Sequence, residues 1–205
     1  MWRRLVCCCV MLLGTACTRV VDGAALPAPG GVAAGVDVDD ILLDQSQMRA
    51  ITGSDEHLTV IPSMDGNSPV DIGSLAATAP PECRFVYEET ATFGPDVGAF
   101  HKTTYQYPPR GGLISEGAAA YRDAGTARRA FDALVATVDR CATTSSGWAF
   151  VGDWHADAQS LHTRPGDCGR DYRLKSVVLV EVTFCGFPAS VSDIVITNIA
   201  ARVPG

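Results

Sequence analysis

The chain has 205 residues, of which 47% are hydrophobic and 19% are charged, and its formal net charge is −7. This apolar share excludes a disordered chain, and the length suits one folded domain with a leader and a linker. An acidic chain without a Lys/Arg cluster is unsuited to nucleic acid and to electrostatic attraction by anionic lipid. Nucleic acid is therefore not an expected partner.

Residues 1–16 have the features of a cleaved export signal. Two arginines precede an apolar stretch at 5–13, which is too short to span a bilayer as a helix. The segment ends Gly-Thr-Ala before Cys17, which resembles the bacterial lipobox, where the cysteine is diacylated and becomes the new N-terminus. We therefore expect a lipoprotein signal peptide at 1–16 and a lipid anchor on Cys17. The alternative is an ordinary secretory signal, cut near Ala16 or at 24–25.

A lipid anchor on Cys17 would place the protein on the extracytoplasmic face of the cell membrane, whereas ordinary cleavage would give a secreted protein. Residues 17–36 are rich in Gly, Ala and Pro and are predicted to form a flexible tether. Such a segment has an end-to-end reach of about 25 Å, which holds a domain clear of a membrane surface. The folded domain is expected at 37–205.

The first half of that domain is predicted to combine short elements with one long loop. Residues 37–52 favour a helix, which Asp37 or Asp39 caps and Gly53 ends. The elements expected after it are a short strand at 58–61, a surface loop at 62–79, a helical turn at 80–89, and a hairpin-like pair of strands at 99–107 and 113–121.

Residues 126–141 are predicted to form the clearest amphipathic helix of the chain, with Thr126 as its cap. Apolar residues recur at steps of four and three, which places them on one face: Ala127, Phe131, Leu134, Val138 and Cys141. Charged residues lie off that line, so one side of the helix can be buried while the other stays in water. Such a helix needs a sheet to pack on.

The second half of the domain is dominated by predicted strands. We expect strands at 147–154 and 155–162, a strong strand at 173–185, and a helix at 189–202. Apolar residues occupy both faces of 173–185, which is typical of a central strand. The order of elements predicts an α+β fold with a mostly antiparallel sheet flanked by helices.

Four cysteines are spread through the body of the domain: Cys83, Cys141, Cys168 and Cys185. In an exported chain they indicate two disulfides, and of the three possible connectivities we favour Cys83–Cys141 with Cys168–Cys185. No pair of them forms a CxxC motif and no nearby histidine completes a zinc-finger spacing. No structural metal is therefore expected.

The best candidates for acid/base or metal chemistry lie between Asp153 and His162. Strand alternation would place Asp153, His155 and Asp157 on one face, but the segment adjoins a predicted turn and carries no established ligand motif. Solvated loop residues are the favoured interpretation, and the isolated His57 and His101 are interpreted in the same way. The sequence contains neither the GxSxG motif of serine hydrolases nor a phosphate-binding glycine loop.

Two other patterns, a pair of adjacent carboxylates and a set of aromatic residues, have both a functional and a structural interpretation. The adjacent carboxylates of Glu88 and Glu89 do not share a face, so paired-carboxylate catalysis is not favoured. An aromatic set could line an apolar cleft, although ordinary core packing is the favoured interpretation: Phe100, Tyr105, Tyr107 and Tyr121. We therefore assign no catalytic residue, no cofactor and no ligand-binding residue.

Taken together, these landmarks resemble the extracellular sensor domain of mycobacterial PknH-type Ser/Thr kinases, a domain that also occurs in stand-alone lipoproteins of the LppH kind. The landmarks are Gly-Thr-Ala-Cys at 14–17, Val-Asp-Gly at 21–23, Ile-Thr-Gly at 51–53, Pro-Glu-Cys at 81–83, Ala127 and Phe131 running to Cys141, and the later cysteine pair. The resemblance implies an antiparallel sheet flanked by helices, two disulfides in the sequential pairing, and a cleft for an unidentified ligand. It implies no kinase activity.

We therefore expect a membrane-tethered, non-enzymatic, sensor-like lipoprotein whose partner is an unidentified small molecule or envelope component. The first alternative is a structural or interaction protein of the cell envelope, which would present a contiguous apolar patch without a cavity. The second alternative is a hydrolase that uses His155 or His162, which requires an acid, base or nucleophile within hydrogen-bonding reach of the ring.

Overall fold

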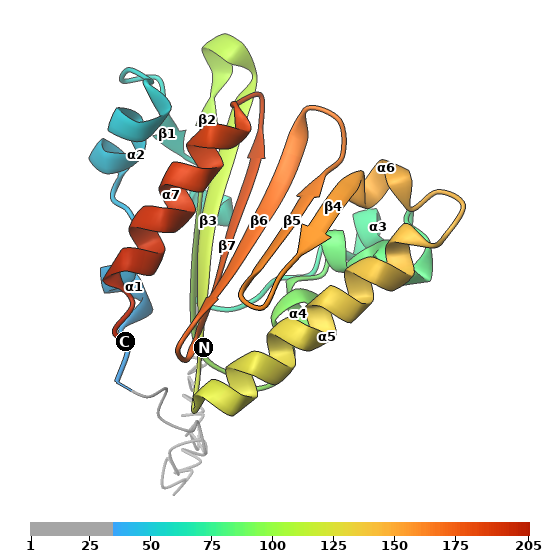
Figure 1. The fold of residues 1–205 in the computed structure, drawn as a ribbon. Coiled ribbons are helices and arrows are strands. Elements are labelled where there is room, and N and C mark those ends of the chain that lie inside the picture. Colours follow the sequence, from blue (N-terminus) through green and yellow to red (C-terminus); the bar gives the residue numbers. More distant parts are fainter. Residues whose placement is uncertain (1–34) are drawn as a thin grey trace, which may run out of the picture.

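The computed structural model describes residues 35–205, in which helices cover both faces of one β-sheet (Figure 1). The predicted signal peptide, Cys17 and nearly all of the predicted tether lie outside the described residues. Two buried clusters of apolar side chains, one on each face of the sheet, form the core. The domain therefore has three layers.

The sheet contains seven antiparallel strands in the order β1-β2-β3-β7-β6-β5-β4 within the described residues. Their bounds are β1 Thr59–Val60, β2 Val97–Tyr107, β3 Gly112–Tyr121, β4 Asp153–Ala156, β5 Ser160–Arg164, β6 Cys168–Lys175 and β7 Val178–Cys185. The predicted α+β class and antiparallel sheet are confirmed. Strand β7 occupies the centre, which explains why its side chains are buried on both faces.

One face of the sheet, called the α7 face below, is covered by α7 (Ala189–Arg202), α1 (Val38–Ile41) and α2 (Gln45–Thr52) (Figure 1). Ile196 and Ile199 of α7 pack against alternate strand residues such as Val180. The two-residue period of the strands sends Leu179 and Glu181 to the opposite face.

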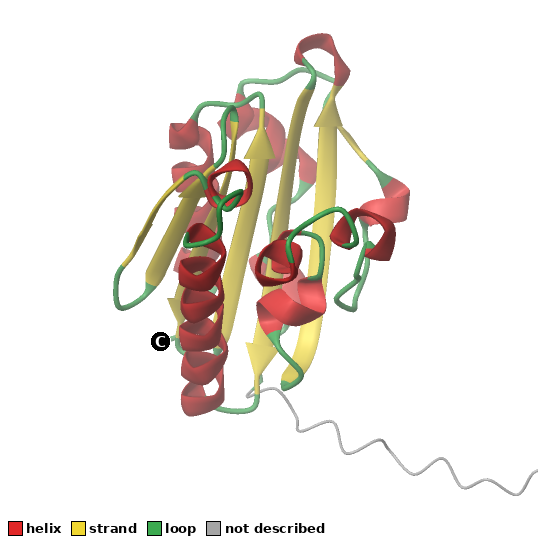
Figure 2. Cartoon of the chain, turned by 90° about the vertical axis from the view of Figure 1, so that its right-hand side faces the viewer, coloured by secondary structure: helices red, strands yellow, loops and turns green. Residues whose placement is uncertain are grey.

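The opposite face, called the α5 face below, is covered mainly by the long helix α5 (Ala124–Ala142), which runs along the sheet in Figure 2. Its apolar residues at steps of four and three are buried as predicted. The shorter helices beside it are α3 (Gly73–Ala76), α4 (Glu89–Phe93), α6 (Trp148–Val151) and the 3₁₀ turn Pro81–Val86. Two further 3₁₀ turns occur at Pro62–Met64 and Pro108–Arg110.

Both predicted disulfides are confirmed. Cys83–Cys141 joins the 3₁₀ turn to the last turn of α5, and both residues are buried in the core of the α5 face. Cys168–Cys185 links residues that lie directly opposite each other on β6 and β7. The first bridge therefore fixes a helix, and the second fixes the open end of a hairpin.

Four predicted elements were wrong in their extent. The strand expected at 155–162 contains the end of β4, the turn at Asp157 and the start of β5, because Asp157 accepts the Gln159 N–H and turns the chain. The helix expected at 37–52 is divided into α1 and α2, because Asp44 starts a second helix through a capping box with Gln47. The strand expected at 173–185 is two strands, β6 and β7, joined by a turn in which Ser176 has a φ of 53°. Residues 147–154 form α6 and the first part of β4, because Gly152 turns the chain with a φ of 56°.

The cap of α5 is Asp123 rather than the predicted Thr126. The Asp123 carboxylate accepts hydrogen bonds from the Thr126 backbone N–H at 2.7 Å and from its hydroxyl at 3.0 Å. We expect Asp123→Ala to lower the free energy of unfolding by about 1 kcal/mol, measured by urea denaturation. Asp132→Ala, on the exposed side of the same helix, is the control and should change it by less than about 0.5 kcal/mol. Equal effects of the two substitutions would contradict the assignment of the cap.

Candidate ligand-binding site

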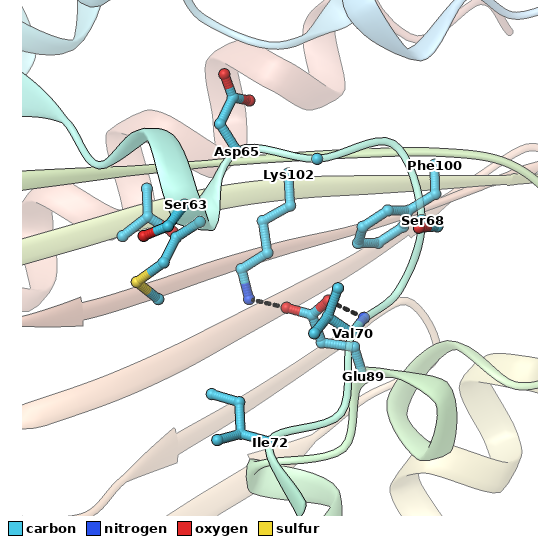
Figure 3. Close-up of a pocket in the computed structure, with 11 residues that line it drawn as sticks. Ser63, Asp65, Ser68, Val70, Ile72, Glu89, Phe100 and Lys102 are labelled. Carbon is cyan, nitrogen blue, oxygen red and sulfur yellow. Dashed lines mark hydrogen bonds and ion pairs between the residues drawn. The ribbon is translucent and has the colours of Figure 1, made fainter. Parts of the chain in front are cut away.

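A pocket of about 160 Å³ opens on the α5 face, between β2 and the loop at residues 62–72 (Figure 3). The side chains that define it come from the loop, from β2 and from the start of α4: Met64, Val70, Ile72, Phe100, Lys102 and Glu89. The predicted loop thus forms one wall of a concave site.

Backbone hydrogen bonds fix this loop to the sheet. Ile61 donates its N–H to the Thr104 carbonyl at 2.8 Å, and Gly66 and Lys102 exchange two bonds at 3.0 Å. Further along, Ile72 donates to the Tyr87 carbonyl at 2.8 Å. The loop lacks a sequence period because its position depends on these tertiary bonds rather than on a regular element of its own.

The floor of the pocket is ionic. The Lys102 ammonium lies 2.7 Å from the Glu89 carboxylate, whose other oxygen accepts the Val70 N–H at 2.8 Å (Figure 3). Lys102 is also 3.8 Å from Glu181, which Arg170 approaches at 3.8 Å from the other side. The floor therefore links the loop, β2, β7 and β6 through one connected set of charges.

Glu181 is buried in this network yet remains an anion. Burial raises the pKa of its carboxyl, but the charges of Lys102 and Arg170 outweigh burial and hold the pKa below its ordinary value. The Thr183 hydroxyl donates to the same carboxylate at 2.6 Å. The Glu181 carboxylate is thus held in its charged form beneath the pocket by the cations on either side of it.

Above the charges the walls of the pocket are mainly apolar, and Ser63, Asp65 and Ser68 of the loop also line it (Figure 3). Phe100 is buried and forms the inner wall, whereas Met64, Val70 and Ile72 are large hydrophobic side chains left exposed at the mouth. Thr104 lines the pocket, and its buried hydroxyl has no hydrogen-bond partner among residues 35–205. The site offers apolar walls, a charged floor and one unused hydroxyl, which is the usual composition of a small-molecule site.

The chain matches the family model of the PknH-like extracellular domain over residues 33–203. The chain belongs to this family. The crystal structure of the extracellular domain of PknH from Mycobacterium tuberculosis is similar, with a TM-score of 0.61, 15% sequence identity, and coverage of 80% of this chain and 93% of that chain. That identity shows a shared fold. A comparison with curated proteins finds no match.

Membership of the PknH-like extracellular domain family confirms the predicted resemblance. A family of extracellular domains and two disulfides agree with the expected extracytoplasmic location. Across residues 35–205, the structure contains no helix with the length and apolarity that a membrane span requires.

The residues first considered for catalysis in this PknH-like domain have other positions. Asp157 forms the turn between β4 and β5, where Ser160 donates its hydroxyl to it at 2.7 Å and lowers its pKa to about 2. His155 is exposed on β4. His162 lies 2.6 Å from Asp171, but no serine, threonine or cysteine of residues 35–205 hydrogen-bonds to its ring. Among residues 35–205, the ring of His162 is therefore paired with a carboxylate and not with a nucleophile.

The other residues considered from the sequence are mostly structural. Tyr105, Tyr107 and Tyr121 belong to the core, whereas Phe100 lines the pocket of the PknH-like domain. His57 pairs with Asp55 within its own turn at 2.9 Å. His101 has a carboxylate on each side of its ring, with Asp39 at 2.7 Å and Asp65 at 2.9 Å.

Lys102 and Glu181 were not predicted from the sequence, and Glu89 was not favoured as a functional residue because adjacent carboxylates do not share a face. One signal was available, since Glu181 interrupts the apolar run of 178–184. A charged residue in a strand buried on both faces is seldom found without a partner. No sequence signal placed Glu89 opposite Lys102, because only the folded loop brings α4 to the edge of β2.

Proposed function

We propose that this PknH-like domain is a lipid-anchored, non-catalytic sensor module that binds a small amphipathic ligand in the pocket between β2 and the loop at 62–72. The observation that carries the proposal is the combination of apolar walls with a charged floor. Phe100 supplies the inner wall and Lys102 the polar end, and Thr104, whose hydroxyl has no hydrogen-bond partner among residues 35–205, follows Lys102 on the same face of β2.

The size of the pocket limits what enters it. A volume of about 160 Å³ is close to that of an engineered cavity of about 150 Å³ that binds benzene. One ring or a short branched chain therefore fills the interior. The rest of the ligand lies over the exposed side chains at the mouth, Met64, Val70 and Ile72.

Ligand binding is coupled to the loop through Glu89. Its carboxylate contacts both Lys102 of β2 and the Val70 N–H of the loop, so an occupant that touches these residues also stabilises the loop against the sheet. A change in the order of a surface loop is the kind of response that a sensor domain passes to a partner.

The test is the binding of 1-anilinonaphthalene-8-sulfonate, an anionic aromatic amphiphile, followed by its fluorescence. Val70→Asp places a charge at the mouth of the pocket on a side chain that is already 57% exposed, so the fold should be retained. We expect it to weaken binding at least about tenfold. Ile194→Asp, on the opposite face and 47% exposed, is the matched control and should leave binding unchanged.

Unchanged probe binding in Val70→Asp, or an equal loss in Ile194→Asp, would refute the pocket as the binding site. Native mass spectrometry of the protein isolated from its own cell envelope then identifies a retained natural ligand. The mass of the N-terminal peptide from the same preparation shows whether Cys17 is acylated.

A further inference from the structure

A second group of side chains lies on the α7 face, on the other side of the sheet from the pocket. It consists of His162 on β5, Asp171 on β6 and Asp193 on α7, and one potential ligand atom of each lies within 4.8 Å of the other two. His162 and Asp171 are direct cross-strand neighbours, and their Nδ1 and Oδ1 atoms are 2.6 Å apart. Three elements therefore bring a nitrogen and two carboxylates to one point.

Asp171 carries an unsatisfied oxygen at this point. Its side chain is 0% exposed, and its Oδ1 atom is contacted by both His162 and Arg164 at 2.6 Å. Its Oδ2 atom is buried and has no hydrogen-bond partner among the described residues. A buried carboxylate oxygen without a donor is unfavourable and rare, which indicates that a positively charged partner belongs there.

Arg164 is not that partner. Its guanidinium contacts only the Oδ1 side of Asp171, while its Nη1 atom donates to the carbonyls of Thr163 at 2.9 Å and of Arg170 at 3.2 Å. It also lies 5.2 Å above the ring of Phe184, which fixes its position further. Arg164 therefore orients the carboxylate in the way that outer-shell groups orient metal ligands, and it leaves Oδ2 without a partner among the described residues.

The charge and the chemistry of the group suit a divalent transition metal. Two carboxylates and one guanidinium leave a net negative charge when His162 is neutral. A set of one imidazole and two carboxylates suits zinc, because magnesium and calcium prefer oxygen ligands alone. Asp193 is exposed and His162 is partly exposed, so an ion can enter from solvent and keep water in its remaining positions.

We propose that His162, Asp171 and Asp193 bind one zinc ion that joins α7 to β5 and β6. The site is separate from the pocket on the α5 face, and it does not depend on the proposed ligand. Its consequence is mechanical, because a shared ion would fix α7 to strands that lie beyond the central part of the sheet.

The experiment uses the full chain with both disulfides formed, after its thiols have been blocked with iodoacetamide and metal has been removed with a chelator. Zinc is titrated by calorimetry, and Tm is measured with and without zinc. We expect one bound ion and a zinc-dependent rise in Tm. Asp193→Asn, an exposed substitution that spares the core, should weaken binding at least about tenfold and remove the rise. His162→Asn should do the same.

His57→Asn is the control, because Asp55, Glu56 and His57 form the other group of metal-ligating side chains with this spacing in residues 35–205. It should leave zinc affinity and the rise in Tm unchanged. No zinc-dependent rise in Tm for the unsubstituted chain would refute the proposal. Loss of binding in His57→Asn with normal binding in Asp193→Asn would refute it equally.

Discussion

Replacement of both Cys83 and Cys141 by alanine is expected to lower the free energy of unfolding by about 4 kcal/mol. The bridge closes a loop with a sequence separation of 58, so its loss releases a large conformational entropy in the unfolded chain. Both sulfurs also lie in the core of the α5 face, where alanine leaves unfilled space. Urea denaturation under non-oxidising and non-reducing conditions measures the change.

The Cys168–Cys185 bridge provides the comparison. It spans a sequence separation of 17, and the same entropy relation gives about 3 kcal/mol for its removal. It also joins two strands that remain paired without it. A larger loss of stability from removing Cys168–Cys185 than from removing Cys83–Cys141 would contradict the prediction, because it would show that loop length does not set the order of the two effects.

Stability is expected to fall as pH rises from about 4.5 to about 8, because of Glu116 on β3. Burial raises the pKa of its carboxyl from 4.5 to about 8, against the Leu43 N–H, the Tyr105 hydroxyl and the charge of Arg202, all of which lower it. In this range the folded protein keeps a proton that the unfolded chain releases, so folding becomes less favourable as pH rises. The full difference corresponds to about 5 kcal/mol at most.

Glu116→Gln isolates this contribution. The amide oxygen can still accept the Leu43 N–H, which is 3.0 Å from Glu116 Oε2, but it carries no charge at any pH. We expect the variant to be more stable than the unsubstituted protein at pH 9 and similar to it at pH 4. Urea denaturation across this range measures both. Parallel pH profiles of the two proteins would contradict the prediction, because they would show that folding leaves the pKa of Glu116 unchanged.

Local sequence patterns predicted the parts of the fold that depend on local rules. Helix α5 was predicted because its apolar residues recur with the helical period, and the second disulfide because its cysteines flank strand-forming sequence. The hairpin of β6 and β7 was missed because its turn contains no glycine, proline or asparagine, and Ser176 adopts the left-handed conformation instead. At this turn, the pairing of β6 with β7 overrides the usual residue preferences of turns.

The pocket could not be predicted from the sequence, because it too depends on tertiary contacts. Lys102 and Glu89 lie on separate elements, and they meet only because the loop at 62–72 is hydrogen-bonded along the outer edge of β2. Such bonds leave no periodic trace in the sequence. Of the group formed by His162, Asp171 and Asp193, only His162 was considered from the sequence. The two aspartates on β6 and α7 were not.

The hydrogen bonds between the loop and β2 also cover one edge of the sheet. Strand β1 is only two residues long, and the loop occupies Lys102 and Thr104 on the same edge. At the opposite edge, β4 has four residues and presents the exposed side chains of Asp153 and His155. Short, covered or polar edges disfavour the addition of a strand from another polypeptide. The domain is thus protected from edge-to-edge aggregation.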